Sequence, residues 1–145
     1  MINKHKPKIP SIINKLQQSK ESFNLLTKQD SLYNTEWLEN NFPIAPQGRI
    51  DWQKLPESFC LKYSNDSELL LAFEEIVVRH KLEGNLIVSW YDALILPVQL
   101  DMDVLRRNIR EIFQEDWDTW ICNQEDEWCI ENHHDGEICF GKCLK

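Results

Sequence analysis

The C-terminal part of the chain carries alternating apolar residues on both sides of a tight-turn sequence. His134-Asp135-Gly136 favours a reverse turn, because glycine readily adopts a positive φ. An odd-length loop places Trp128 and Ile130 on the same face as Ile138 and Phe140, whereas a two-residue loop sets apolar residues against polar ones. The pattern therefore predicts a hairpin with an odd loop. The opposite face of that hairpin carries Cys129, Glu131, Cys139 and Gly141.

The rest of the sequence predicts further strands and three helices. Helical periodicity runs from Ser11 to about Leu26, from Asn65 to about Leu82, and from Asp101 or Asp103 through Phe113. Strands are predicted at Phe59–Tyr63, Leu86–Tyr91, Leu94–Gln99, Thr119–Asn123, Glu127–Asn132 and Glu137–Cys143. The stretch from Asp30 to Pro56 reads as an irregular segment whose aromatic residues pack on the core.

These elements predict one α+β domain with a mostly antiparallel sheet of about five or six strands and three helices. A chain of 145 residues has room for one such core and little more. Residues 1–9 are basic, contain Pro7 and lack apolar periodicity. We expect residues 1–9 to form a loose tail that is dispensable for folding, and residues 10–145 to form the domain.

Hydropathy and cysteine usage predict a cytoplasmic protein. The longest apolar run, Ala93 to Val98, is far shorter than the roughly 20 residues of a membrane helix. The lysines near the N-terminus are not followed by the apolar region of a signal peptide. The five cysteines are an odd number, which fits reduced thiols in a reducing compartment.

Charge is spread unevenly along the chain. The net charge is −8, whereas residues 1–30 carry six lysines and two acids. From Glu111 to Glu137 there are ten acids and no lysine or arginine. This balance argues against a general binder of nucleic acid or of membrane surfaces, because both require clustered basic residues.

A cluster of cysteine and histidine residues offers a metal-binding alternative. It comprises Cys122, Cys129, His133, His134, Cys139 and Cys143. The successive cysteines are separated by six, nine and three residues, and no pair has the short spacing of a zinc knuckle. Buried cysteines in strands also act as small apolar residues. We therefore expect no metal or other cofactor, and we expect the protein to fold without metal.

Catalysis is a third reading, and the sequence gives it little support. His133 and His134 lie beside Asp135, with cysteines nearby, but a nucleophilic thiolate requires an electropositive setting. The surrounding segment is acidic, and the sequence contains no phosphate-binding glycine loop or nucleophile elbow. A polar turn accounts for the histidines equally well, so we predict that the protein is not an enzyme.

Acidic residues interleaved with tryptophans form the strongest candidate site. The candidate partner-binding residues are Asp116, Trp117, Asp118, Glu125, Asp126, Glu127, Glu131, Asp135 and Glu137. Such a segment can be a solvated face, but an exposed tryptophan within an acidic field is typical of a binding surface for a basic protein. Trp117, which lies between two acids, is the expected exposed anchor. Trp128 is expected in the core.

Three segments of the C-terminal part carry a family resemblance. They are Trp117-Asp118-Thr119-Trp120-Ile121, Glu127-Trp128-Cys129-Ile130-Glu131-Asn132 and Gly136-Glu137-Ile138-Cys139-Phe140-Gly141-Lys142. Their spacing of aromatics and acids resembles small bacterial immunity proteins of contact-dependent growth inhibition and related polymorphic toxin systems. The resemblance covers roughly residues 85–142, and no functional residue transfers by motif.

The resemblance implies a non-enzymatic protein that binds and blocks one cognate toxin domain, often a nuclease. A nuclease active site is basic because it holds phosphates, so an acidic protein suits it. We therefore expect an immunity protein with a protein partner and no direct contact with nucleic acid or membrane. The alternative is a small metal-binding or regulatory domain that uses the cysteines and histidines.

Overall fold

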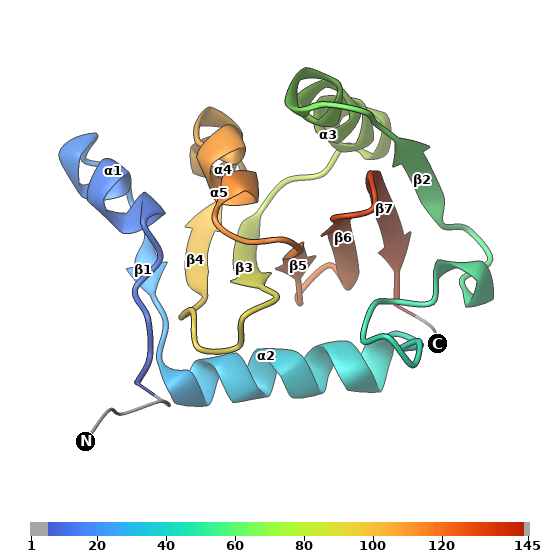
Figure 1. The fold of residues 1–145 in the computed structure, drawn as a ribbon, viewed down its shortest axis with the longest axis horizontal. Helices are drawn as coiled ribbons and strands as arrows, with labels where there is room; N and C mark the ends of the chain where they lie inside the picture. Colours follow the sequence, from blue (N-terminus) through green and yellow to red (C-terminus); the bar gives the residue numbers. More distant parts are fainter. Residues whose placement is uncertain (1–5, 144–145) are drawn as a thin grey trace.

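Seven strands form one antiparallel sheet in the computed structural model, which describes residues 6–143 (Figure 1). Their order across the sheet is β1-β4-β3-β5-β6-β7-β2. The strands are β1 (Asn24–Leu25), β2 (Phe59–Lys62), β3 (Asn85–Trp90), β4 (Val98–Asp101), β5 (Thr119–Asn123), β6 (Trp128–His133) and β7 (Glu137–Lys142). The sheet and its helices make a single α+β domain.

Helices cover both sides of the sheet. One side carries α1 (Ile12–Gln18), α3 (Asp66–His80), α4 (Met102–Arg107) and α5 (Ile109–Gln114), and α2 (Lys28–Asn41) runs along the other side (Figure 1). Thr27, Asn65 and Asp101 begin α2, α3 and α4, because each side chain accepts a hydrogen bond from the backbone N–H three residues later.

Strand alternation divides the buried side chains between two cores. The larger core, beneath α1, α3, α4 and α5, includes Leu86, Val88, Ile121, Trp128, Ile130, Ile138 and Phe140. The smaller core, on the α2 side, consists of Phe42, Ile50, Trp52, Leu55, Cys122, Cys129 and Cys139. Gly141 lets Trp52 approach the sheet, since a Cβ at this glycine would come within 2.8 Å of the indole. The 42–55 segment is thereby packed directly on β5, β6 and β7.

The predicted hairpin is confirmed. Ile130 lies opposite Phe140 and His133 lies opposite Glu137, which leaves a three-residue loop at positions 134–136. Gly136 has a φ of +95°, as the turn requires. Trp128 is 3% exposed and lies in the larger core, as expected.

The prediction of an irregular segment from Asp30 to Pro56 was wrong for residues 30–41. α2 occupies residues 28–41, and Asn34 is the one residue of this helix that is buried. Its side chain lies 3.4 Å from the Ser89 hydroxyl and accepts from Gln124 at 3.0 Å. A helix that buries a polar residue and exposes Leu32 and Tyr33 has no apolar periodicity to reveal it.

Other predicted boundaries are corrected as well. The first helix ends at Gln18, and residues 24–25 form the short edge strand β1. The strand predicted at 94–99 begins only at Val98. The third helix divides at Asn108, whose φ of −123° departs from helical geometry and whose amide donates to the Val104 carbonyl. The described residues thus form seven strands and five α-helices, rather than the predicted five or six strands and three helices.

Lys8 connects the N-terminal segment to the rest of the domain. Its backbone N–H donates to the Leu94 carbonyl at 2.7 Å, and its carbonyl accepts from the Leu96 N–H at 2.9 Å. Its ammonium lies 2.8 Å from an Asp92 carboxylate oxygen. The expectation that residues 1–9 are dispensable for folding stays a prediction, and residues 1–5 lie outside the described residues.

Candidate functional site

The acidic segment of residues 116–137 is divided between the two ends of the sheet. Asp116, Trp117 and Asp118 precede β5, and Asp135 follows β6 in the turn at the same end, because Thr119 pairs with Asn132. Glu125, Asp126 and Glu127 lie in the β5–β6 turn at the opposite end. β6 has six residues, which at about 3.4 Å per residue separates its ends by roughly 17 Å.

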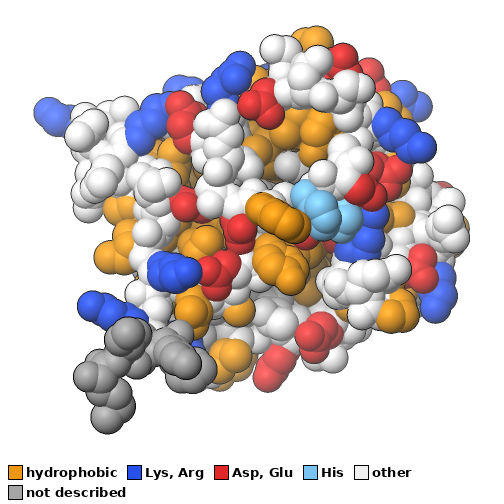
Figure 2. Space-filling view, in the orientation of Figure 1, with side chains coloured by type: hydrophobic (Ala, Val, Ile, Leu, Met, Phe, Trp, Pro, Cys, Tyr) orange, Lys and Arg blue, Asp and Glu red, His pale blue; other side chains and the backbone are white. Residues whose placement is uncertain are grey.

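Trp117 is the exposed aromatic of the first group. Its side chain is 68% exposed, and its ring centroid lies 5.0 Å from that of His134. Tyr91, which is 64% exposed, lines the same hollow together with Asp92, Ala93, Asp116 and Trp117. On the face shown in Figure 2, hydrophobic side chains lie exposed near the centre, beside a histidine and several acids.

We call this surface, made by Tyr91, Asp92, Asp116, Trp117 and His134, the Trp117 face. Asp116 fixes its shape by accepting from the Asp92 N–H at 2.6 Å and from the Trp117 N–H at 2.8 Å. Tyr91 and Asp92 were missed in the sequence. The signal that brings them here is strand pairing, since Trp90 at the end of β3 lies opposite Thr119 at the start of β5.

An apolar groove adjoins the Trp117 face on the α2 side. Leu38, Ile44, Tyr91, Ala93 and Ile95 are among the residues that line it. Tyr91 and Ala93 line both the groove and the hollow beside Trp117. The exposed aromatics are thus continuous with a recess into which an apolar side chain fits.

Asp118 lies beneath the Trp117 face rather than on it. The residue is 4% exposed, and its Oδ1 accepts from the His134 backbone N–H at 2.7 Å. The same oxygen lies 2.9 Å from His134 Nδ1. Asp118 therefore positions His134, whose ring packs against Trp117.

Glu131 is fully buried and holds the smaller core together. Its two oxygens accept from the Ile50 N–H at 2.8 Å, the Trp52 indole at 2.9 Å and the Trp120 indole at 2.8 Å. Arg49 Nε also donates to Glu131, at 3.3 Å. Because every one of these donors belongs to the same chain, Glu131 has a structural role and is removed from the proposed contact surface.

Arg49 gathers three of the predicted acids. Besides Glu131, it contacts Asp135 at 3.1 Å and Glu137 at 3.2 Å. Burial by itself lowers the pKa of Arg49, but these carboxylates outweigh burial and raise that pKa above its ordinary value. Burial raises the pKa of Asp135, and His133 and Arg49 more than offset this effect, so the pKa is lowered. Arg49 lies about 80 residues upstream of these acids, so the sequence pattern did not predict that they pair with it.

The three acids of the β5–β6 turn form a separate group. Glu125 and Asp126 are exposed, and Glu127 is half-buried. The Asp126 N–H donates to the Asn123 side chain at 2.8 Å, and the Glu127 carbonyl accepts from the Cys143 N–H at 2.9 Å. This group offers charge without an exposed tryptophan beside it.

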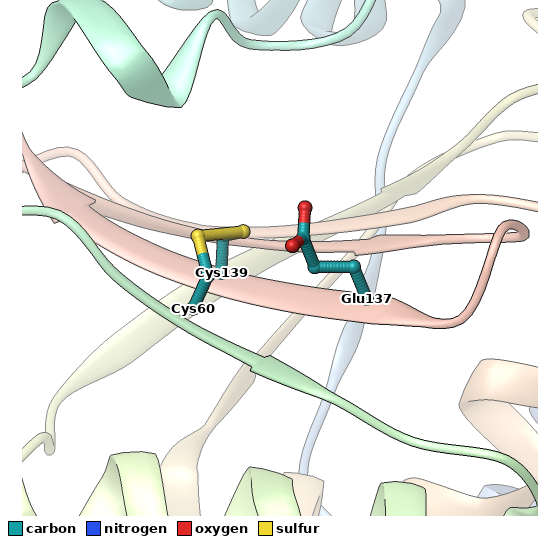
Figure 3. A group of neighbouring side chains, drawn as sticks. All are labelled: Cys60, Glu137 and Cys139. Atoms are coloured by element: carbon teal, nitrogen blue, oxygen red, sulfur yellow. A yellow bond between two sulfur atoms is a disulfide. The ribbon is translucent and has the colours of Figure 1, made fainter.

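The expectation of five reduced thiols is corrected by a disulfide between Cys60 and Cys139 (Figure 3). The two residues are direct cross-strand partners in β2 and β7, with Cα atoms 4.1 Å apart. Glu137, two residues before Cys139 on β7, points to the same side of the strand (Figure 3). The bonded sulfurs cannot serve with Glu137 as thiolate ligands for a metal.

Cys122 and Cys129 are free and fully buried, with their sulfurs 3.2 Å apart. Burial and the neighbouring Cys122 raise the pKa of the Cys129 thiol well above its ordinary value. A protonated, inaccessible thiol is a poor nucleophile and a poor metal ligand. These two residues pack as small apolar side chains.

We expect the purified, non-reduced protein to contain three titratable thiols after unfolding, because the disulfide uses two of its five cysteines. Prior reduction should raise the count to five. The measurement is thiol titration in denaturant with and without a reductant. Five thiols in the non-reduced sample, after purification in air, would contradict the disulfide.

Two groups of possible metal ligands come together within the described residues. One is Cys60, Glu137 and Cys139, and the other is Asp118, His133 and His134. The predicted cysteine–histidine cluster is thus divided, because the cysteines face the smaller core whereas the two histidines lie at the end of the sheet beside Trp117.

The geometry defines an α+β protein with an exposed aromatic and acidic surface. A buried carboxylate, that of Glu131, lies beneath the 42–55 segment. The chain matches, over residues 12–141, the model of the family described as CdiI immunity protein EcoliA0-like, and it belongs to that family. The resemblance seen in the C-terminal part is confirmed, and the match extends through the N-terminal half. None of the curated proteins compared with the chain matches it.

Family membership indicates an immunity protein, a class whose members bind protein toxins. Among the helices of residues 6–143, none combines the length and hydropathy that a membrane-spanning helix requires.

Proposed function

We propose that the chain binds a cognate toxin domain through the Trp117 face and neutralises it. The observation that carries this proposal is an exposed tryptophan, Trp117, held among carboxylates and beside an apolar groove. Interface anchors are enriched in tryptophan and tyrosine. Tryptophan side chains are on average highly buried, so one as exposed as Trp117 is unusual. Trp117 and Tyr91 supply two such anchors on one face.

The acids around these anchors favour a basic partner. Asp116 and Asp92 line the hollow, and Asp92 is paired with Lys8. Asp135 lies in the neighbouring turn, where Arg49 contacts it. A toxin that cleaves nucleic acid has a basic phosphate-binding surface, and opposite potentials accelerate association. We therefore infer a nuclease as the toxin, neutralised in the cytoplasm of the cell that makes the immunity protein.

Removing two charges beside Trp117 should slow association with the toxin. We expect the double variant Asp116→Asn/Asp135→Asn to reduce the association rate at low salt by up to about tenfold, with a smaller effect on dissociation. Its association rate should also depend less steeply on ionic strength. The measurement is binding kinetics against the cognate toxin domain at two salt concentrations.

The matched control is Glu125→Gln/Asp126→Asn, which removes two charges at the other end of the sheet. We expect this control to slow association clearly less. An unchanged association rate and salt dependence for Asp116→Asn/Asp135→Asn would show that these acids serve the fold and do not attract the toxin. Equal slowing by both variants would contradict the assignment of the contact to the Trp117 face.

A further inference from the structure

Asp118, His133 and His134 converge at the end of the sheet beside the Trp117 face. One potential ligand atom from each lies within 4.8 Å of those of the other two. The β5–β6 pairing creates this cluster, because it places the residue before β5 next to the end of β6. His134 Nδ1 is already 2.9 Å from Asp118 Oδ1, and the two imidazole centroids are 4.3 Å apart.

The chemistry of this donor set is selective. Two neutral imidazoles and one carboxylate suit Zn²⁺ and its neighbours among the divalent first-row metals. Calcium and magnesium prefer oxygen ligands in larger number. We propose that Asp118, His133 and His134 bind one such transition-metal ion, with Zn²⁺ as the reference ion and at least one coordination position open to solvent.

Binding requires only local rearrangement. In a tetrahedral zinc site with bonds of roughly 2.0–2.1 Å, neighbouring ligand atoms are about 3.3 Å apart. Ligand atoms that lie farther apart than this must approach one another, whereas His134 Nδ1 and Asp118 Oδ1, now 2.9 Å apart, must separate slightly. The His134 side chain is 47% exposed, so its ring can shift without disturbing the buried core. Asp118 is held in place by the His134 backbone N–H, which contacts Oδ1. The carboxylate thus has a second oxygen, Oδ2, for the metal.

Asp118 belongs to the acidic segment, and His133 and His134 belong to the predicted cysteine–histidine cluster. Asp118 is too buried for a toxin contact, and the histidines are too far from the free thiols in the smaller core to share a metal with them. The proposed ion stands at the rim of the Trp117 face. This proposal departs from the expectation, drawn from the sequence, that the protein binds no metal. It concerns an accessory site on an already folded domain, so the expectation that the protein folds without metal is unaffected.

The proposal is tested on the metal-free full chain without any toxin, so its failure and that of the toxin-binding proposal are distinguishable. Calorimetric titration with ZnCl₂ should show one equivalent bound. Ni²⁺ or Cu²⁺ should quench tryptophan fluorescence, because the Trp117 ring lies 5.0 Å from that of His134. His134→Ala should weaken Zn²⁺ binding by at least about tenfold, as expected for the loss of a ligand.

Glu125→Gln is the matched control, since it alters an exposed acid at the other end of the sheet. It should bind Zn²⁺ like the unmodified chain. Asp118→Asn, with folding checked by circular dichroism, should also bind more weakly. Absence of binding at millimolar Zn²⁺, or equal affinity in His134→Ala and the unmodified chain, would overturn the proposal.

Discussion

Replacing Glu131 by alanine is expected to lower the free energy of unfolding by about 3–5 kcal/mol, the range for removing one partner of a buried ionic network. The carboxylate is fully buried and accepts from two indoles, one backbone N–H and one guanidinium. Its removal leaves the N–H groups of Trp52, Trp120 and Ile50 without these acceptors. An unpaired buried donor costs about 1–3 kcal/mol.

Urea unfolding at neutral pH measures this effect. The free energy of unfolding of Glu131→Gln should lie between those of the alanine variant and the unmodified chain. The amide retains one acceptor oxygen, but its NH₂ group faces groups that also donate. Glu125→Ala, at an exposed position, should change the free energy of unfolding by at most about 0.5 kcal/mol. A loss of less than about 1 kcal/mol for Glu131→Ala would show that water or other groups replace the carboxylate.

The sequence predicted the C-terminal half of the sheet well, because local rules govern it. Apolar alternation and a glycine turn determine the β6–β7 register, and the same register places Glu131 on the face opposite Ile130. Local rules do not predict which segment packs on the face of the sheet that carries Glu131. Arg49, Ile50 and Trp52 come from a segment about 80 residues earlier, so Glu131 looked like one more surface acid.

The partner-binding role of the candidate residues stays a prediction, whereas the structure does show where these residues lie. Trp117 is exposed as expected. The acids counted with it are close in sequence, but a strand hairpin separates consecutive turns by the length of a strand. Asp116 thus comes together with Tyr91 and Asp92, which follow β3, and Asp135 lies in a turn at the same end, whereas Glu125 lies at the opposite end. Such groupings follow from strand pairing, which charge patterns do not encode.

The cover provided by α2 was also beyond the reach of sequence patterns. A helix is recognised by an apolar stripe, and α2 buries only Asn34. Its position follows from contacts that the fold creates. Trp37 and Leu38 pack, partly buried, against the smaller core, and Asn34 contacts Ser89 on β3 and Gln124 in the β5–β6 turn. Leu32 and Tyr33 are exposed, so the apolar residues of α2 do not form the buried stripe that is typical of a packed helix.

Trp117→Ala is expected to weaken toxin binding by about 2 kcal/mol or more, as for an interface hot spot. The ring is 68% exposed in the free protein, so its removal should leave the free energy of unfolding nearly unchanged. The loss should appear mainly in the dissociation rate, which rises about 30-fold for 2 kcal/mol. Leu71→Ala is the matched control, because Leu71 is 72% exposed on α3, on the far side of the larger core.

The dissociation rate of the complex with the cognate toxin domain therefore tests the central claim most directly. The measurement compares the unmodified chain, Trp117→Ala and Leu71→Ala on the same immobilised toxin domain. We predict a complex that dissociates about 30-fold faster for Trp117→Ala and at the unmodified rate for Leu71→Ala. Dissociation of the Trp117→Ala complex at the unmodified rate would contradict the claim that the Trp117 face binds the toxin.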